Sequence, residues 1–259
     1  MAPPLLTLNN GTKIPQLGLG VYQIRPAQIP TAITTALNSG YRSIDTAAMY
    51  GNEPEVAEAL RTSGIPRRDL FITTKVWNTD HGYDNTLRAF DRSAAALGEI
   101  DLYLIHWPQP QHNLYVETWR ALERLLHEGR VRAIGVSNFG IQELRRLLDE
   151  TDVIPAVNQV ELHPWQQQAP LRAFHTEHGI ATEAWSPLAR GRHLNDRVIT
   201  ALAAKYGKTP AQLVLRWHLQ LGTIVIPKSA TPSRIRENAA VFDFELADDD
   251  LLALAELDS

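Results

Sequence analysis

Short apolar segments alternate with longer amphipathic ones along most of the chain, and this alternation is the feature that most constrains the fold. The longer segments show helical spacing: Ile141, Leu144, Leu147 and Leu148 fall on one face of a helix. A repeated strand–helix unit predicts a parallel sheet, because each crossover helix must cover one face of it. The predicted strands are Gln16–Leu19, Arg42–Ile44, Leu70–Thr74, Leu102–Ile105, Val131–Val136, Ala156–Val160, Ile180–Glu183 and Thr223–Ile226.

Eight strands favour closure into a (β/α)8 TIM barrel over an open doubly wound sheet. An open dinucleotide-binding sheet would have the pattern G-x-G-x-x-G after its first strand, whereas this chain reads Leu17-Gly18-Leu19-Gly20-Val21-Tyr22 there. We therefore expect a single barrel domain over residues 1–259. We also expect an N-terminal β-hairpin, with Leu5–Leu8 and Lys13–Ile14 on either side of an Asn-Asn-Gly turn, and a C-terminal helix.

Helix-ending glycines support the predicted strand–helix order. Gly40, Gly64, Gly98, Gly129 and Gly179 each follow a helical segment and precede a strand. The clearest predicted helices are Asn85–Leu97, Val116–His127, Ile141–Leu148 and Ala169–His178.

Composition excludes several functional classes. The chain has no cysteine, so disulfides, thiolate metal sites and cysteine nucleophiles are excluded. A net charge of −4 provides no field that would attract nucleic acid or an anionic membrane. No apolar run approaches the roughly 18 residues that would span a bilayer. The start of the chain does not have the pattern of a signal peptide, so we expect a cytoplasmic enzyme, acting as a monomer on a small molecule.

Ionisable residues follow three of the predicted strands directly. Asp45, Lys75 and His106 each come at or just after a strand end, and Tyr50 lies in the loop after Asp45. Active sites of (β/α)8 barrels lie at the C-terminal ends of the strands. Taken singly, Asp45 and Lys75 equally suit a structural ion pair, and His106 suits a structural histidine. Their combination favours a catalytic constellation.

These four residue types suit proton donation to a carbonyl oxygen. The pKa of tyrosine is near 10, which is high for an acid at neutral pH, and a neighbouring Lys75 ammonium is expected to lower it. Asp45 would keep Lys75 charged, and His106 would orient the carbonyl. By contrast, His81, His112 and His193 show no partners in the sequence, and we expect them in surface loops.

Six segments in order resemble the aldo-keto reductases, over the chain from about Leu6 to Leu257. They are Gly40–Ala47 with Tyr50–Glu53, Phe71–Trp77, Asp101–Pro108, Ile134–Phe139, Asn158–Pro164 and Ile226–Ser229. The resemblance maps the family's catalytic residues onto Tyr50, Lys75, Asp45 and His106. It implies hydride transfer from a nicotinamide, with Tyr50 protonating the carbonyl oxygen and no metal.

The resemblance also implies a cofactor site for NADPH. Ser137, Asn138 and Gln159 would bind the nicotinamide carboxamide, and Trp185 would stack on the nicotinamide ring. Lys228, Ser229 and Arg234 would bind the adenosine 2′-phosphate, and Glu237 and Asn238 the adenine. Local sequence supports anion sites, because Thr231-Pro232 predicts a helix N-terminus beside Lys228. Ser186, Leu188 and Arg190 follow the seventh strand, where backbone N–H groups and the guanidinium would meet the pyrophosphate.

Substrate preference is inferred from similarity to one branch of the family. Trp185, Gly207–Gln212 and Leu215–Gln220 resemble the bacterial 2,5-diketo-D-gluconate reductase branch. This similarity, together with a chain that ends at Ser259 where many members have a further tail, predicts small dicarbonyls or keto-sugar acids as substrates. The predicted pocket walls are Tyr22, Trp77, His106, Trp107 and Phe139, which lie just past strand ends.

Two other functions remain as alternatives. A lysine at a strand end would also suit a barrel enzyme in which Lys75 forms a Schiff base. Because some family members act as nucleotide-sensing subunits of larger assemblies, a binding role is the second alternative.

Overall fold

The computed structural model describes residues 3–258, and its centre is a parallel barrel. Backbone bridges join Leu17 to Val225 and Gly20 to Lys228, and the amide of Gly18 donates to the Val225 carbonyl at 2.8 Å. These contacts connect the first strand to the last, so the predicted barrel is confirmed as a closed one. Its strands, each paired with the next in chain order, are β3 (Leu19–Gly20), β4 (Ser43–Asp45), β5 (Phe71–Val76), β6 (Leu102–Ile105), β7 (Ala133–Ser137), β8 (Val157–Glu161), β9 (Ala181–Trp185) and β10 (Ile224–Val225).

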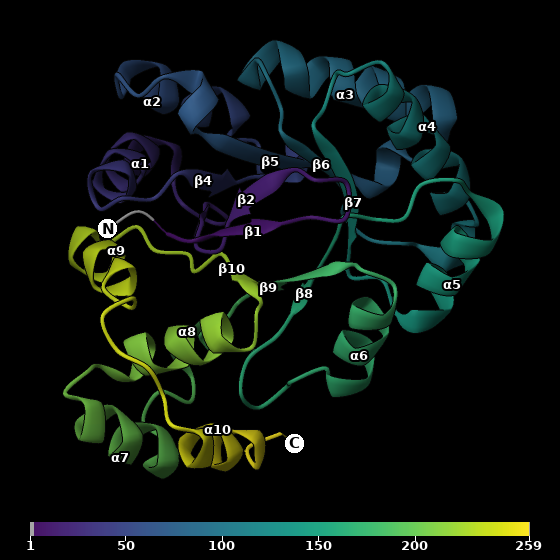
Figure 1. Cartoon of the computed structure of the whole chain (residues 1–259). Helices are drawn as coiled ribbons and strands as arrows, with labels where there is room; N and C mark the ends of the chain where they lie inside the picture. Colours follow the sequence, from purple (N-terminus) through teal and green to yellow (C-terminus); the bar gives the residue numbers. More distant parts are fainter. Residues whose placement is uncertain (1–2, 259) are drawn as a thin grey trace.

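Helices surround the barrel (Figure 1). The predicted helix-ending glycines all have positive φ, between 67° and 98°, which is why glycine is favoured there. The expected C-terminal helix is α10 (Asp248–Ala255). Its Asp250 forms an ion pair at 2.8 Å with the Lys205 ammonium of α7 (Arg197–Tyr206). The helices are α1 (Ile29–Asn38), α2 (Glu53–Thr62), α3 (Tyr83–Leu97), α4 (Tyr115–His127), α5 (Ile141–Glu150), α6 (Ala169–Glu177), α7 (Arg197–Tyr206), α8 (Pro210–Gln220), α9 (Pro232–Ala239) and α10 (Asp248–Ala255).

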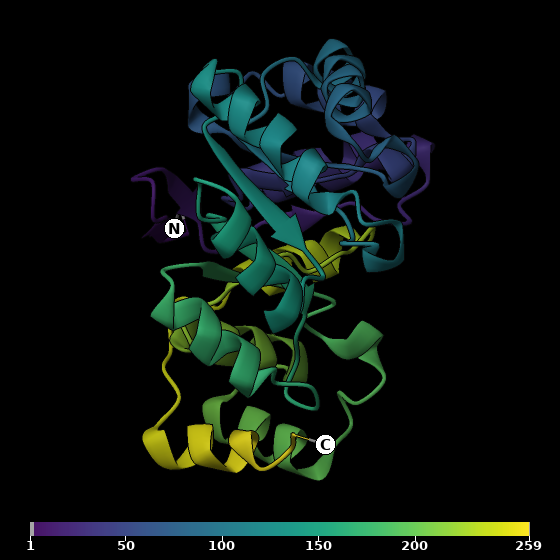
Figure 2. The same ribbon diagram turned by 90° about the vertical axis from the view of Figure 1, so that its right-hand side faces the viewer.

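The predicted N-terminal hairpin seals one end of the barrel. Its strands β1 (Leu5–Thr7) and β2 (Lys13–Pro15) pair antiparallel and lie across the barrel in Figure 1, and Figure 2 shows them at the edge of the molecule beside the N label. Leu8 and Ile14 of the hairpin are buried against an apolar layer inside the barrel, formed by Phe71, Leu102, Leu104, Ala133, Ala156, Val157 and Ile224. A pocket that penetrates the barrel must therefore open at the opposite end, where the strands terminate.

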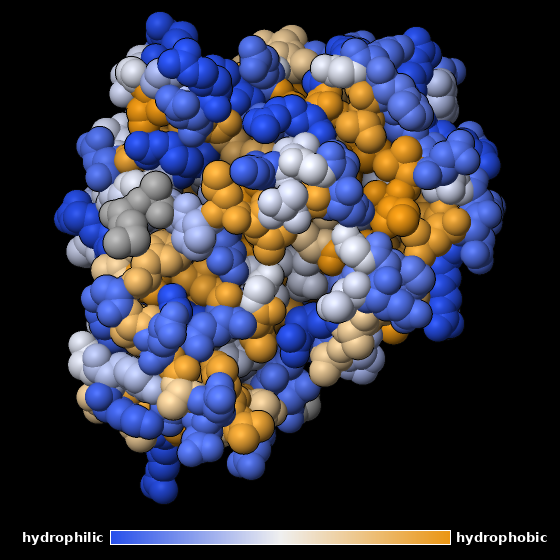
Figure 3. Space-filling view, in the orientation of Figure 1, coloured by the Kyte–Doolittle hydropathy of each residue, from blue (hydrophilic) through white to orange (hydrophobic). Residues whose placement is uncertain are grey.

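The main apolar core lies between the strands and the helices. Trp119 and Trp217 are its largest fully buried side chains, and the Trp119 indole donates to the Val153 carbonyl at 3.1 Å, so its polar atom is satisfied. The surface that carries the hairpin is a mosaic of polar and apolar residues (Figure 3). Among the described residues, every helix is too short or too polar to cross a membrane.

Candidate active site

A pocket of about 200 Å³ opens at the C-terminal ends of the strands. It brings together most of the residues predicted for the site, from β3, β4, β6, β7, β8, β9 and β10 and the loops that follow them. Its lining residues are Gly20, Tyr22, Asp45, Met49, Tyr50, His106, Trp107, Ser137, Asn138, Gln159, Trp185, Ser186, Arg190, Ile226 and Lys228. Lys75 lies beneath this lining and is fully buried.

Lys75 and Asp45 form an ion pair inside the barrel. The ammonium Nζ of Lys75 lies 2.6 Å from Oδ1 of Asp45 and donates to the Thr46 carbonyl at 2.9 Å. Burial disfavours the charge on Lys75, but the Asp45 carboxylate and Tyr50 favour it, and the net result is a raised pKa of Lys75. Lys75 is therefore an ammonium at neutral pH.

Tyr50 stands above this ion pair, at the end of a short 3₁₀ turn (Ala48–Tyr50). The Lys75 ammonium lies 5.4 Å from the centre of its ring. Burial raises the pKa of Tyr50 above its ordinary value, whereas the charge of Lys75 opposes the shift. Lys75 lowers the pKa of Tyr50 as expected, but desolvation of the phenolate outweighs this attraction, so the net pKa is raised. Tyr50 keeps its proton at neutral pH.

His106 is a neutral imidazole in this site. Its ring meets Tyr50 and Trp77 edge to face, at centroid distances of 5.8 and 5.0 Å. Burial and the nearby Lys75 charge lower the pKa of His106 to about 3. A neutral ring donates one hydrogen bond, which suits it to orient an oxygen rather than to compete with Tyr50 as an acid.

Two polar clusters form the floor of the pocket. Asn138 donates to the His106 carbonyl and to Oγ of Ser137, each at 3.0 Å, and accepts from the Trp185 indole at 2.9 Å. The amide nitrogen of Gln159 donates to Oδ2 of Asp45 at 2.8 Å and to Oε2 of Glu183 at 2.9 Å. The sequence analysis missed Glu183. Its place two residues before Trp185 in β9, on the same face of the strand, is a signal that would have indicated it.

This floor fits a nicotinamide carboxamide. Both N–H groups of Gln159 are occupied by carboxylates, so its carbonyl Oε1 is the part left for a ligand. Oδ1 of Asn138 has one protein donor and a second lone pair free. The amino group of a carboxamide has two N–H groups to donate to these acceptors. The half-buried Trp185 ring, fixed by its hydrogen bond to Asn138, would cover one face of the nicotinamide.

The residues predicted for the rest of the cofactor extend from this pocket. Ser186 and Arg190 line it, and both have positive φ, of 48° and 56°. Leu188 does not line the pocket but is half-buried against the core. The helix predicted at Thr231-Pro232 is α9, but within the described residues the Thr231 side chain makes no capping hydrogen bond; instead, Oγ of Ser229 accepts the Thr231 amide at 3.1 Å.

Two exposed cations lie near the start of α9. Lys228 and Arg234 make no ion pair within residues 3–258. Farther along the helix, Glu237 accepts from the Thr209 hydroxyl at 2.7 Å, and Asn238 is buried. The spacing of Arg234, Glu237 and Asn238 places them on one face of α9.

The mouth of the pocket is aromatic and apolar. Tyr22 and Trp107 are partly exposed there, and the Tyr22 ring lies 4.9 Å from the Tyr50 ring. Met49 lines the same mouth, although the sequence analysis did not select it. Trp77, a predicted pocket wall, contacts the His106 ring but does not line the pocket, which corrects that prediction.

Two further expectations need correction. Phe139 is buried and packs against Tyr115 at 5.5 Å, because the left-handed Asn138 just before it turns the chain and directs the next side chain into the core. It therefore does not line the pocket. His81 is not a surface residue but is only 4% exposed, and neither ring nitrogen has a hydrogen-bond partner within residues 3–258. Burial lowers the pKa of His81 to about 4.

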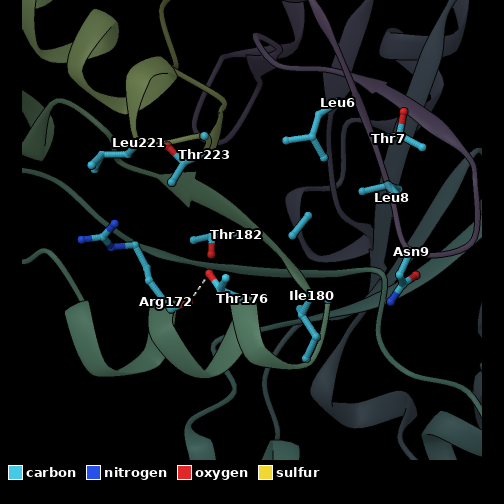
Figure 4. Close-up of a pocket in the computed structure, with 13 residues that line it drawn as sticks. Leu6, Thr7, Leu8, Asn9, Arg172, Thr176, Ile180, Thr182, Leu221 and Thr223 are labelled. Carbon is cyan, nitrogen blue, oxygen red and sulfur yellow. Dashed lines mark hydrogen bonds between the residues drawn. The ribbon is translucent and has the colours of Figure 1, made fainter.

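A second cleft, of about 300 Å³, lies at the sealed end of the barrel between the hairpin and α6 (Figure 4). Its polar side chains are already engaged: Thr182 with His175 at 2.8 Å, and Thr176 with the Arg172 carbonyl at 3.0 Å. The cleft lies at the N-terminal ends of β9 and β10, away from the ion pair of Lys75. It lacks the convergent free groups of an active site. Among the described residues no cluster of metal-binding side chains is found.

A closed parallel barrel with ionisable groups at its strand ends defines the class of (β/α)8-barrel enzymes. The model of the aldo/keto reductase family matches residues 15–259. An aldo-keto reductase of Mycolicibacterium smegmatis is 54% identical, over 99% of this chain and 94% of that protein. The Escherichia coli protein named methylglyoxal reductase DkgA is 51% identical, over 99% of this chain and 94% of its own.

The same family appears among solved structures. A mutant of Gox0644 in complex with NADPH has a TM-score of 0.96 and 48% identity, covering all of this chain and 95% of that one. With a family match over nearly the whole chain, this protein belongs to the aldo/keto reductase family and is an oxidoreductase.

Proposed function

We propose that this protein reduces aldehydes and ketones to alcohols with NADPH, and that Tyr50 is the general acid. The observation that carries the proposal is the position of a protonated Tyr50 over the buried, charged Lys75, with neutral His106 beside it. Family membership supports the reaction class.

The proton transfer follows from the states of these groups. A carbonyl oxygen would lie between Tyr50 and His106, which donate hydrogen bonds to it. NADPH, when bound, supplies the hydride. The oxygen then becomes an alkoxide, which is much more basic than a phenolate, so Tyr50 gives up its proton in spite of its raised pKa. The Lys75 ammonium, held by Asp45, stabilises the phenolate that remains.

Cofactor binding is assigned to residues on both sides of the pocket. Ser137, Asn138 and Gln159 would hold the carboxamide, and Trp185 would stack on the ring. Lys228, Ser229 and Arg234 would bind the 2′-phosphate that distinguishes NADPH from NADH. The unpaired cations at the start of α9 support this preference, as does the NADPH in the related Gox0644 structure. Ser186, Leu188 and Arg190 would meet the pyrophosphate, and Glu237 and Asn238 the adenine.

Small dicarbonyls of the methylglyoxal type are the proposed substrates, with keto-sugar acids such as 2,5-diketo-D-gluconate as the second class. The name of the E. coli relative supports the first class. The mouth formed by Tyr22, Met49 and Trp107 carries no charge, which suits a small uncharged dicarbonyl.

Schiff-base chemistry at Lys75 is disfavoured. Its ammonium is engaged by Asp45 and Thr46 and is held charged, whereas a nucleophilic amine must lose its proton.

The test is NADPH oxidation by aldehydes, dicarbonyls and keto-sugar acids, with wild type and Tyr50→Phe. The variant should lose about 10²–10⁴-fold in turnover, the usual contribution of general acid catalysis, and should bind NADPH as before. Tyr103→Phe is a matched control, because the Tyr103 hydroxyl is buried, has no hydrogen-bond partner among the described residues and lies outside the pocket. If Tyr50→Phe kept more than about half of the turnover, with an isotope effect showing that chemistry limits the rate, another group would be the acid.

A further inference from the structure

Glu183 is a buried acid that the reaction described above does not use. It lies on β9, is 1% exposed, and sits beneath the pocket without lining it. We propose that Glu183 is a positioning residue: it holds one amide hydrogen of Gln159 and thereby fixes the Gln159 carbonyl toward the nicotinamide carboxamide. The inference rests on the proposed function, in which Gln159 binds that group.

The chemistry of the contacts sets the orientation of the Gln159 amide. Its nitrogen lies 2.8 Å from Oδ2 of Asp45 and 2.9 Å from Oε2 of Glu183. The Asp45 carboxylate, which is paired with the Lys75 ammonium, only accepts hydrogen bonds, so the nitrogen of Gln159, and not its oxygen, must face it. With the NH₂ group held on two sides, Oε1 is directed away from both acids.

Each of the two acids holds a different hydrogen. Asp45 comes from β4 and Glu183 from β9, where it pairs in register with Gln159 of β8. With Asp45 as its only partner, the Gln159 amide could rotate about the Cγ–Cδ bond, because a single hydrogen bond does not fix the plane of the amide group. Glu183 removes this freedom, so the acceptor for a carboxamide is in place before a cofactor arrives.

Glu183 occupies a position at which an ionised carboxylate is electrostatically unfavourable. Burial and the nearby Asp45 carboxylate raise the pKa of Glu183 to about 7, whereas the Gln159 hydrogen bond and Lys75 oppose this shift. An apolar side chain of similar size would avoid this cost. A protonated Glu183 still has a carbonyl oxygen that accepts from Gln159, so the contact survives in either state.

A double-mutant cycle tests the proposal, with NADPH affinity measured by fluorescence titration. Glu183→Leu should raise the Kd for NADPH about tenfold, the lower end of the range for a hydrogen bond to a charged group. Gln159→Ala should raise it by a similar factor. In the Gln159→Ala background, Glu183→Leu should change the Kd by less than about twofold, because no amide remains to be positioned. Glu183→Gln, whose carbonyl oxygen can accept, should restore wild-type affinity within about threefold.

A second readout needs no cofactor. The side-chain NH₂ resonances of Gln159 in the free protein, identified by their loss in Gln159→Ala, should shift and exchange faster in Glu183→Leu. Glu183→Ala replaces the leucine variant in both measurements if the latter does not fold. Glu123→Gln is the control, since Glu123 is a buried acid on α4 that does not line the pocket and whose oxygen accepts the backbone amides of Asp152 and Val153.

The outcomes separate this inference from the proposed function. If Gln159→Ala weakens NADPH binding but Glu183→Leu does not, the positioning role is overturned and the cofactor site stands. If Glu183→Leu weakens binding equally with and without Gln159, Glu183 acts in another way and the proposal is also wrong. If Gln159→Ala leaves NADPH binding unchanged, the proposed cofactor site fails, and this inference fails with it.

Discussion

The Lys75 ammonium lies 2.6 Å from Oδ1 of Asp45, and both side chains are buried beneath the pocket. Removing one partner of a buried pair leaves an unpaired charge, so Asp45→Asn should destabilise the fold by about 3–5 kcal/mol. Urea unfolding measures the loss. The double variant Asp45→Asn/Lys75→Met should recover most of it, because no charge then remains. Glu58→Gln, which breaks the exposed pair with Arg61, should cost less than about 1 kcal/mol. An equal loss of unfolding free energy in Asp45→Asn and Glu58→Gln would contradict the burial of the Asp45–Lys75 pair.

Arg234 and Arg236 offer a matched pair on α9. Both are exposed, but their spacing of two directs them to different sides of the helix. Arg234→Ala should weaken NADPH binding by about 10- to 100-fold and leave NADH almost unchanged, because only NADPH carries the 2′-phosphate. Arg236→Ala should affect neither. Fluorescence titration at two salt concentrations measures both. Equal weakening of the two cofactors by Arg234→Ala, without salt dependence, would place the phosphate elsewhere.

His106 should remain neutral throughout the physiological range. Burial and the charge of Lys75 lower its pKa to about 3, so its imidazole should keep the chemical shifts of the neutral ring from pH 8 down to about pH 4. Nuclear magnetic resonance on protein labelled at histidine measures this, and His106→Gln identifies the resonance. A transition near pH 6.5 would show that the ring is more hydrated than its surroundings indicate.

Glu183 should impose a pH dependence on stability. Its pKa is raised to about 7 in the folded protein, from an ordinary value of 4.5, so the folded state binds the proton more tightly than the unfolded state. The contribution of protonated Glu183 to the free energy of unfolding is therefore fully present below about pH 4.5 and is lost as the pH rises to about 7. The stability of Glu183→Gln relative to wild type should thus increase between these values. A difference that is flat with pH would mean that Glu183 is ionised across the range, in spite of Asp45.

Much of the architecture can be predicted from local sequence patterns. The strand-length apolar segments and the helix-ending glycines locate the eight strands, because periodicity and backbone preference are properties of neighbouring residues. The same patterns place Asp45, Lys75 and His106 at strand ends, and parallel strands that close into a barrel bring those ends together. The resemblance to the aldo-keto reductases then adds Ser137, Asn138, Gln159 and Trp185, all of which the structure places around one pocket.

Other properties depend on tertiary structure because they sum contributions from strands far apart in the chain. The raised pKa of Tyr50 is a balance between burial and Lys75, and no local pattern gives the size of either. Phe139, a predicted pocket wall, is buried, and Met49, for which the sequence predicts no role, lines the pocket, because the direction of a loop side chain depends on the backbone turn before it. Glu183 and Gln159 lie on the neighbouring strands β9 and β8, and they reach Asp45 of the distant strand β4 only in the closed barrel. The sequence determines which residues end the strands, and the folded barrel decides which of them touch, how deeply they are buried, and which protons they hold.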